Sequence, residues 1–124
     1  MAVVNPTIKD ISGDGSVFLV KWILPLAADT GAPIGMVEWG DRSIQAEGTF
    51  GGTAALQCSN DSTDGTDGTF VACNDTGGTA ITWSATASIK QVLPVARFMH
   101  PINGSGCTAV TYTMIVRRSN TMRT

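Results

Sequence analysis

Charged side chains are scarce in this sequence of 124 residues. They make up 15% of it, against roughly 25% in a typical soluble domain. The net charge is −2, and no basic patch is interleaved with aromatic residues, so the electrostatic footprint of a nucleic-acid-binding protein is missing. A surface this poor in charge is more common where partners cover much of it. The length predicts one domain with a modest core.

Long apolar runs are also missing. The longest one, VFLVKWILPLAA, is interrupted by Lys21 and Pro25 and is too short to cross a bilayer. The first residues show no charged segment followed by an apolar stretch, as a secretory leader would. We therefore expect no membrane association and no signal peptide.

Cysteine is limited to three residues, Cys58, Cys73 and Cys107. An odd number, without a secretion signal, argues against a framework of disulfides. Cys58 and Cys73 nevertheless flank one polar loop and could face each other across a hairpin. A bridge between them, formed after release into an oxidising medium, remains an open alternative.

The side chains that carry most enzymatic chemistry are few. His100 is the single histidine, and the only glutamates are Glu38 and Glu47. No GxSxG turn marks a serine nucleophile, no CxxC or HxxxH pair marks zinc, and no glycine-rich loop ends in Lys-Ser/Thr. The sequence predicts no catalytic residue, cofactor or metal, and we expect a protein that is not an enzyme. A hydrolase is the least favoured function class.

The most polar segment runs from Leu56 to Phe70, LQCSNDSTDGTDGTF, with aspartates at 61, 64 and 67. A calcium loop of the EF-hand type needs acids at its positions 1, 3 and 5 and a glutamate at position 12. Here the acids stand at positions 1, 4 and 7, and Ala72 stands at position 12. Asp-Gly pairs form tight turns because glycine tolerates positive φ. We interpret the segment as a hairpin connection with a solvated acidic tip, and calcium binding as the alternative.

What the chain has in abundance is alternation of apolar and polar residues with a period of two. RSIQAEGTF, residues 42–50, places Ile44 and Ala46 on the face opposite Glu47, and AVTYTMIVR, residues 109–117, alternates in the same way. SVFLVKWIL, residues 16–24, is apolar on both faces and predicts a central or covered strand. TAALQCSN and GTFVACN predict a hairpin, and TAITW, SIKQVLP and VARFMHPI predict short strands or a helical turn. Seven to nine strands indicate an all-β fold, an antiparallel β-sandwich or jelly-roll-like single domain, over residues 16–118.

The two ends of the chain differ in character from the body. Residues 1–15 predict an extended N-terminal arm whose apolar Val3, Val4 and Ile8 dock on a partner, with a frayed terminus as the alternative. Residues 119–124 form a polar C-terminal tail. Arg117, Arg118 and Arg123 stand close together near the end of the chain. They either complement the acidic loop of another copy or are simply solvated.

Several short motifs follow one another along the chain, at Asp29 to Pro33, Gly40 to Gln45, Gly48 to Gly52, Ser59 to Asp61, Ala96 to Pro101, and Val116 to Arg118. Their order resembles the succession DTGAP, GDRSVQ, GTFGG, SNDG, PRYIRP and ARR. That succession is shared by a family of small tailed-bacteriophage proteins encoded beside the major capsid protein. The resemblance covers about residues 20–118. The chain departs from it by an inserted TDG after SNDST and by Phe98-Met99-His100 where aromatic-Ile-Arg is usual.

The resemblance implies a capsid decoration, or cement, protein. Such a protein is a compact β-sandwich on the exterior of an icosahedral virion, made in the host cytoplasm. Its partners are the major capsid protein and copies of itself, as a homotrimer. The alternative is a carbohydrate- or receptor-binding jelly-roll module on the head or tail, which exposed Trp39 and Trp83 would favour.

Candidate interface residues follow from these expectations. Trp22 and Trp83 are predicted to lie in the core, whereas Trp39 belongs either to the core or to an interface. The candidate contacts with the capsid or with other subunits are Val3, Val4, Ile8, Trp39, Arg117, Arg118 and Arg123.

Overall fold

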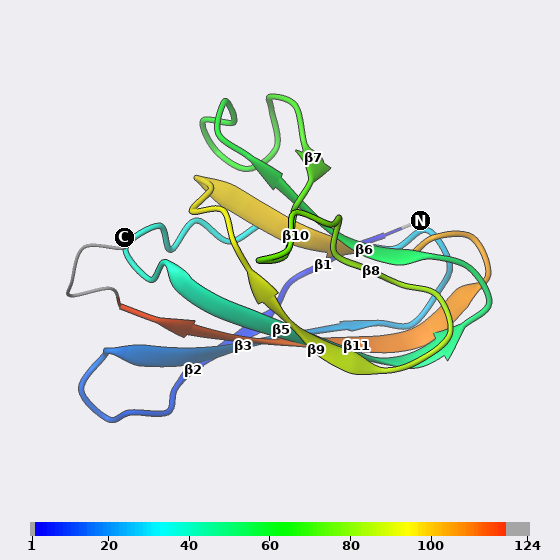
Figure 1. Ribbon diagram of the computed structural model, residues 1–124, viewed down its shortest axis with the longest axis horizontal. Coiled ribbons are helices and arrows are strands. Elements are labelled where there is room, and N and C mark those ends of the chain that lie inside the picture. The colour runs from blue at the N-terminus through cyan, green and yellow to red at the C-terminus, as the bar shows by residue number, and fades with distance from the viewer. Residues whose placement is uncertain (1, 119–124) are drawn as a thin grey trace.

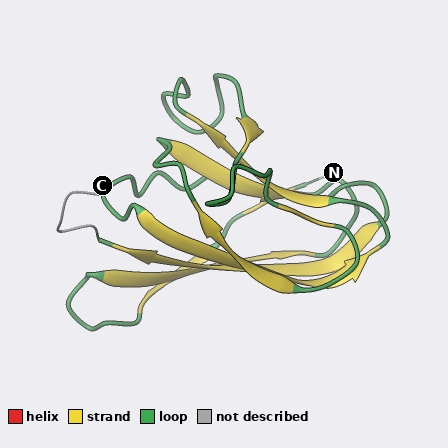
Figure 2. Ribbon diagram, viewed as in Figure 1, coloured by secondary structure: helices red, strands yellow, loops and turns green. Residues whose placement is uncertain are grey.

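A computed structural model describes residues 2–118 and shows two β-sheets packed face to face, with no helix among these residues (Figures 1 and 2). The antiparallel β-sandwich predicted from the sequence is confirmed. The strands are β1 (Val3–Val4), β2 (Thr7–Asp10), β3 (Val17–Leu24), β4 (Thr30–Gly31), β5 (Asp41–Phe50), β6 (Ala54–Ser59), β7 (Val71–Ala72), β8 (Thr82–Trp83), β9 (Ser88–Val92), β10 (Phe98–Ile102) and β11 (Cys107–Arg117). They outnumber the seven to nine expected because β1, β4, β7 and β8 have two residues each.

One sheet has the strand order β2-β3-β11-β5-β9, and all its neighbours are antiparallel. The predicted alternation holds along its two longest strands. In β5, Ile44 and Ala46 are fully buried while Glu47 is exposed. In β11, Cys107 is buried before a bulge, and after the bulge the buried residues recur at every second position from Val110 to Val116. Inward and outward side chains must alternate because successive residues of a strand point to opposite faces.

Strand β3 has neighbours on both edges, as its apolar sequence predicts, but one of its faces is open. Val20, Trp22 and Leu24 point into the core. Ile23 points outward, and 55% of it is exposed. The outer face of this sheet therefore carries apolar side chains that no part of the described chain covers.

The second sheet has the order β1-β4-β10-β6-β7, and β8 also pairs with β6. Strands β6 and β7 form the predicted hairpin, with Gln57 opposite Ala72 and Cys58 opposite Val71. VARFMHPI, which predicted a strand or a helical turn, contains the strand β10, which pairs with β6. Pro101 lies within β10, beside β4 and β6.

The core lies between the sheets and contains Trp22 and Trp83, as predicted. The indole N–H of Trp22 donates to the carbonyl of Ala32 at 3.0 Å. The same ring lies so close to Gly31 that a Cβ there would come within 2.5 Å of it. Glycine at this position thus lets β4 approach the tryptophan, because any side chain would collide with the ring.

Residues 2–10 are extended, as expected of the N-terminal arm, but they lie along their own sandwich. β1 pairs in parallel with β4 in one sheet, and β2 pairs antiparallel with β3 in the other. The amide N–H of Ala2 donates to the buried carboxylate of Asp29 at 3.0 Å. The first residues therefore supply an edge strand to each sheet. From the sequence, the sandwich was expected to begin only at residue 16.

Within residues 2–118, no helix is long and apolar enough to cross a membrane.

Candidate functional site

Three of the sequence-predicted interface residues meet at one end of the sandwich. Arg118 follows β11, and its guanidinium lies 4.9 Å from the centre of the Trp39 ring. The Trp39 indole N–H donates to the carbonyl of Gly15 at 3.1 Å, and its ring meets Phe18 edge to face at 5.5 Å. Trp39 is half-buried against the core and also covered by Arg118.

The arginines at this end pair with carboxylates of their own chain. Arg117 contacts Asp41 at 2.9 Å, and Arg118 contacts Glu38 at 3.1 Å. We call the group Glu38, Trp39, Asp41, Arg117 and Arg118 the arginine end. Its two ion pairs are solvent-exposed, with 65% of the Arg117 side chain and 47% of the Arg118 side chain accessible. Exposed pairs of this kind contribute about 0 to 1 kcal/mol, so the arginines can exchange these carboxylates for a partner's at little cost.

The apolar residues of the predicted arm are not part of the arginine end. Val3 and Val4 lie in β1, at the edge of the six-stranded sheet, and Ile8 lies in β2, at the edge of the five-stranded sheet. Val3 and Ile8 are exposed, and Val4 is partly buried against the core. Arg123 lies outside the described residues.

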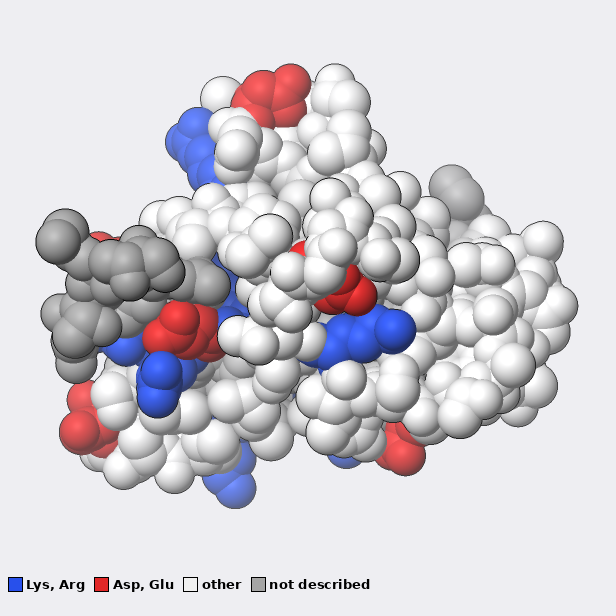
Figure 3. Space-filling model, in the orientation of Figure 1, with Lys and Arg blue, Asp and Glu red and all other residues white. Residues whose placement is uncertain are grey.

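Exposed apolar side chains are more widespread than the sequence reasoning proposed. The large hydrophobic residues of residues 2–118 that are at least 44% exposed are Val3, Ile8, Ile11, Ile23, Leu26, Val37, Val71, Ile89, Leu93 and Val95. On the face shown in Figure 3, charged side chains form isolated spots separated by broad uncharged surface. The outer face of the five-stranded sheet also contains a shallow hollow of about 440 Å³, which is lined in part by Ile89, Ile115 and Arg117.

The acidic loop between β6 and β7 uses its aspartates to bind its own backbone. Asp67 accepts hydrogen bonds from the amide and hydroxyl of Thr63, at 2.7 and 2.6 Å, and from the hydroxyl of Ser62 at 2.9 Å. Asp64 accepts from the amide and hydroxyl of Thr66, and Asp61 accepts from the amide of Thr69. These bonds hold the pKa of Asp67 and of Asp61 below the usual range, because they stabilise the ionised carboxylate.

A loop whose carboxylates are taken up in this way is a structured turn rather than a merely solvated tip. Among residues 2–118, no cluster of three or more His, Cys, Asp or Glu side chains is placed to hold a metal ion. The aspartates therefore have a structural role: Asp64 and Asp67 each close a short turn, and Asp61 joins the beginning of the loop to Thr69 near its end.

His100 lies in β10 at the wall of a small apolar hollow that also contains Val3 and Phe70. Its ring packs on Phe70 with 4.6 Å between centroids. The Nδ1 atom lies 3.1 Å from the carbonyl oxygen of Gly31, and Nε2 lies 3.2 Å from the side-chain amide of Gln57. Burial lowers the pKa of His100, so the ring is neutral at physiological pH. No described acid or nucleophile contacts it, and the ring has a structural place in the sheet.

Sequence reasoning missed Arg42, which is the most deeply buried charged group of β5. Only 3% of the residue is exposed. Its Nε atom donates to the carbonyl of Trp39 at 2.8 Å, and one terminal nitrogen donates to the carbonyl of Met36. The alternation along β5 could have indicated this burial. Arg42 lies two residues before Ile44 and four before Ala46, so its side chain points to the same face of the strand, the face assigned to the core.

Comparison with protein-family models gives no match, and comparison with curated proteins gives none either.

Proposed function

We propose that this protein is a structural virion protein that binds the outer surface of an icosahedral phage capsid and cements neighbouring major capsid subunits. One observation carries the proposal: large apolar side chains are exposed around a sandwich whose sequence is poor in charge. Exposed apolar side chains mark a surface for a partner where they gather into a contiguous patch. The succession of motifs that resembles phage decoration proteins supports the same conclusion.

Cementing requires many copies rather than a strong single contact. On a capsid, the sandwich faces a repeated surface, and modest contacts add up through multivalency. Val3, Ile8 and the partly buried Val4 supply apolar contacts at the sheet edges. Arg117 and Arg118 supply charge-assisted hydrogen bonds to carboxylates of the capsid or of a neighbouring copy. The proposed partners are thus the major capsid protein and copies of this chain, arranged as a homotrimer on the exterior of the virion.

The experiment mixes purified protein with undecorated capsids of the phage that encodes it, and in parallel with a glycan array. We expect saturable binding to the shells at a fixed ratio of copies, and no bound glycan. Absence of shell binding would overturn the proposal.

The arginine end provides a variant with a matched control. Replacing Arg117 and Arg118 with alanine removes two exposed cations, and Lys21→Ala removes an exposed cation from the outer face of β3. We expect the double variant to weaken shell binding by about tenfold at low salt, with little effect of Lys21→Ala. Equal effects would show that the arginine end is not a specific contact.

A carbohydrate- or receptor-binding module on the head or tail is the competing function. Sugars commonly stack on open aromatic faces, and the structure offers few of them: Trp83 is only 2% exposed, and Arg118 lies over Trp39. Binding on the glycan array without shell binding would favour this alternative.

A further inference from the structure

Cys58 and Cys73 share the inward face of the β6–β7 hairpin. Cys58 stands opposite Val71. The amide of Cys73 donates to the carbonyl of Leu56 at 3.1 Å, which places Cys73 one inward position further along the hairpin. The two cysteines are therefore diagonal neighbours on one face, and their thiols are close enough to share a side-chain hydrogen bond. Both are free thiols in this structure.

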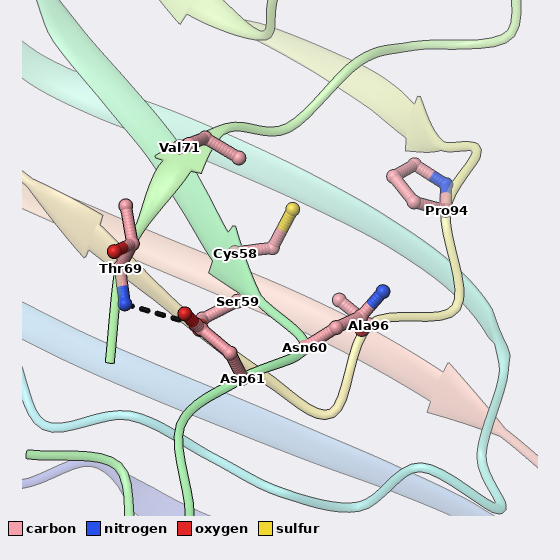
Figure 4. A pocket seen from close by; sticks show the side chains of 8 residues that line it. All are labelled: Cys58, Ser59, Asn60, Asp61, Thr69, Val71, Pro94 and Ala96. Atoms are coloured by element: carbon pink, nitrogen blue, oxygen red, sulfur yellow. Dashed lines mark hydrogen bonds between the residues drawn. The ribbon is translucent and has the colours of Figure 1, made fainter. Parts of the chain in front are cut away.

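The two thiols differ in access. Cys58 lines an open pocket of about 300 Å³ between the acidic loop and the segment after β9 (Figure 4). Asp61, Thr69 and Pro94 belong to the same lining. Cys73 is fully buried and does not contribute to the pocket. Cys58 is 7% exposed and Cys73 is not exposed at all, so a molecule in the pocket would meet Cys58 before Cys73.

A buried positive charge lies near both sulfurs. Two nitrogens of the Arg42 guanidinium donate hydrogen bonds to backbone carbonyls. The third nitrogen is buried and has no hydrogen-bond partner. Buried charges are normally paired, and no ion pair joins Arg42 to a carboxylate among residues 2–118. Burial lowers the pKa of Arg42 to about 10, and the electrostatic influence of Cys73 and Cys58 opposes that shift. An anion at the hairpin would supply the countercharge that Arg42 lacks.

The two cysteines differ in pKa, and disulfide exchange requires the lower pKa at the cysteine that attacks first. A side-chain hydrogen bond from Cys73, with a smaller contribution from Arg42, lowers the pKa of Cys58. The same hydrogen bond, together with burial, raises the pKa of Cys73. The accessible sulfur is therefore the one that becomes a thiolate, and the thiolate is the nucleophile in disulfide exchange.

We propose that Cys58 and Cys73 form a thiol–disulfide exchange site, with Cys58 as the attacking thiol, Cys73 as the resolving thiol and a small-molecule disulfide of the glutathione class as co-reactant. The Cys58 thiolate attacks one sulfur of that disulfide, the sulfur–sulfur bond breaks, and one small thiolate leaves. The Cys73 thiol gives its proton to the departing thiolate. Its sulfur then attacks the sulfur of Cys58 and releases the second small thiolate, which takes up from water the proton that Cys58 lost on ionisation. Two protein thiols are oxidised, and one small disulfide is reduced to two thiols.

The resulting bridge would close residues 58–73 into a ring at the base of the acidic loop. It would limit separation of β6 from β7 at the point where the loop leaves the sheet. This consequence is independent of the proposed role on a capsid, since it depends only on the hairpin and its pocket.

The test incubates the folded, reduced protein with oxidised glutathione at neutral pH, then alkylates the remaining thiols and maps the cysteines by mass spectrometry. We expect a bridge between Cys58 and Cys73, with Cys107 left as a thiol. The bridged form should melt about 5 to 10 °C higher than the reduced form. Cys107→Ala is the matched control and should form the same bridge, because Cys107 lies in β11 of the other sheet.

Two single variants test the order of attack. Cys73→Ser should accumulate a mixed disulfide with glutathione on Cys58, and Cys58→Ser should remain unmodified while folded. The proposal is overturned if the wild-type protein forms no bridge, if it stops at the mixed disulfide, or if Cys58→Ser acquires glutathione on Cys73. Circular dichroism of each variant before oxidation establishes that the comparison is made on folded protein.

Discussion

The hydroxyl of Tyr112 connects strand β11 to a buried asparagine. It donates to the side-chain oxygen of Asn103 at 2.7 Å, and the Asn103 amide donates to the carbonyls of Leu24 and Leu26 at 3.1 and 3.0 Å. Leu24 and Leu26 lie where the chain leaves β3, Asn103 lies just after β10, and Tyr112 reaches them from the middle of β11. The network ties two connections of the sandwich together, because each buried polar atom depends on the next.

Removing this hydroxyl should therefore be costly. We expect Tyr112→Phe to lower the free energy of unfolding by about 1 to 3 kcal/mol, since it leaves the Asn103 oxygen buried without its donor. Urea denaturation measures the loss. Thr113→Val, a change on the outward face of the same strand, is the control and should cost less. A loss below that of the control would show that the network does not stabilise the fold.

His100 should make stability depend on pH. Its folded pKa is lowered by burial, whereas its unfolded pKa is about 6.5. The unfolded chain thus binds the proton more readily, so stability is highest above pH 6.5 and falls as the pH drops from there toward the folded pKa. We expect urea midpoints to decline between pH 7.5 and 5.5 in the wild-type protein and to decline less in His100→Gln. Parallel pH profiles would contradict this account.

The orientation of single residues was predictable where apolar and polar residues alternate. The inward positions of Ile44, Val110 and Tyr112 follow from period two alone, because a strand leaves no other choice once one face is buried. Arg42 was missed since a charged residue is usually assigned to solvent. Its position depends on backbone carbonyls of a neighbouring loop, which local sequence does not reveal.

At the level of elements, the acidic loop is stabilised by hydrogen bonds to its own carboxylates. Asp67 accepts from the amides of Thr63 and Asp64 as well as from two hydroxyls. We expect Asp67→Asn to accelerate amide hydrogen exchange at Thr63 and Asp64, because an amide oxygen is a weaker acceptor than a carboxylate. Glu47→Gln, an exposed change in β5, is the control. Unchanged exchange in Asp67→Asn would contradict the proposed role of the carboxylate.

The first strands provide a second prediction at this level. Deleting residues 1–9 removes β1, most of β2, and the backbone hydrogen bonds that Ala2 and Val4 form with Thr30 and Ala32. We expect a loss of at least about 1 kcal/mol in unfolding free energy, measured in urea, with little change in Lys9→Ala. A truncated protein as stable as the full chain would show that these strands contribute only contacts with partners.

Sequence analysis identified the apolar character of these first residues but not their destination. Val3, Val4 and Ile8 would fit any exposed sheet edge. β1 pairs with β4, which is not its neighbour in sequence, whereas β2 pairs with β3, the next strand along the chain. The hairpin of β6 and β7 was predictable because its strands are neighbours in sequence. The contact of Trp39 with Arg118 was not predictable, because these residues are far apart in sequence and come together only through the pairing of β5 with β11.

For the whole molecule, the path of the chain couples the two sheets. Going from β1 to β11, the chain passes from one sheet to the other at most of its connections. Neither sheet consists of one continuous stretch, so neither can form or unfold alone. We expect a single cooperative transition, with the fluorescence of Trp22 in one sheet and Trp83 in the other changing at the same urea concentration. Variants that retain only one of these tryptophans measure this, and separated midpoints would contradict it.

The chain enters the sandwich at one end and leaves it at the other. Ala2 lies beside Asp29, near the buried Asn103, whereas Arg118 lies beside Ser16 and Glu38 (Figure 1). A label fused before residue 2 and another fused after residue 118 would therefore be separated by the length of the β-sheets. Energy transfer between two such labels would report how the long axis of the molecule is oriented relative to any surface on which it rests.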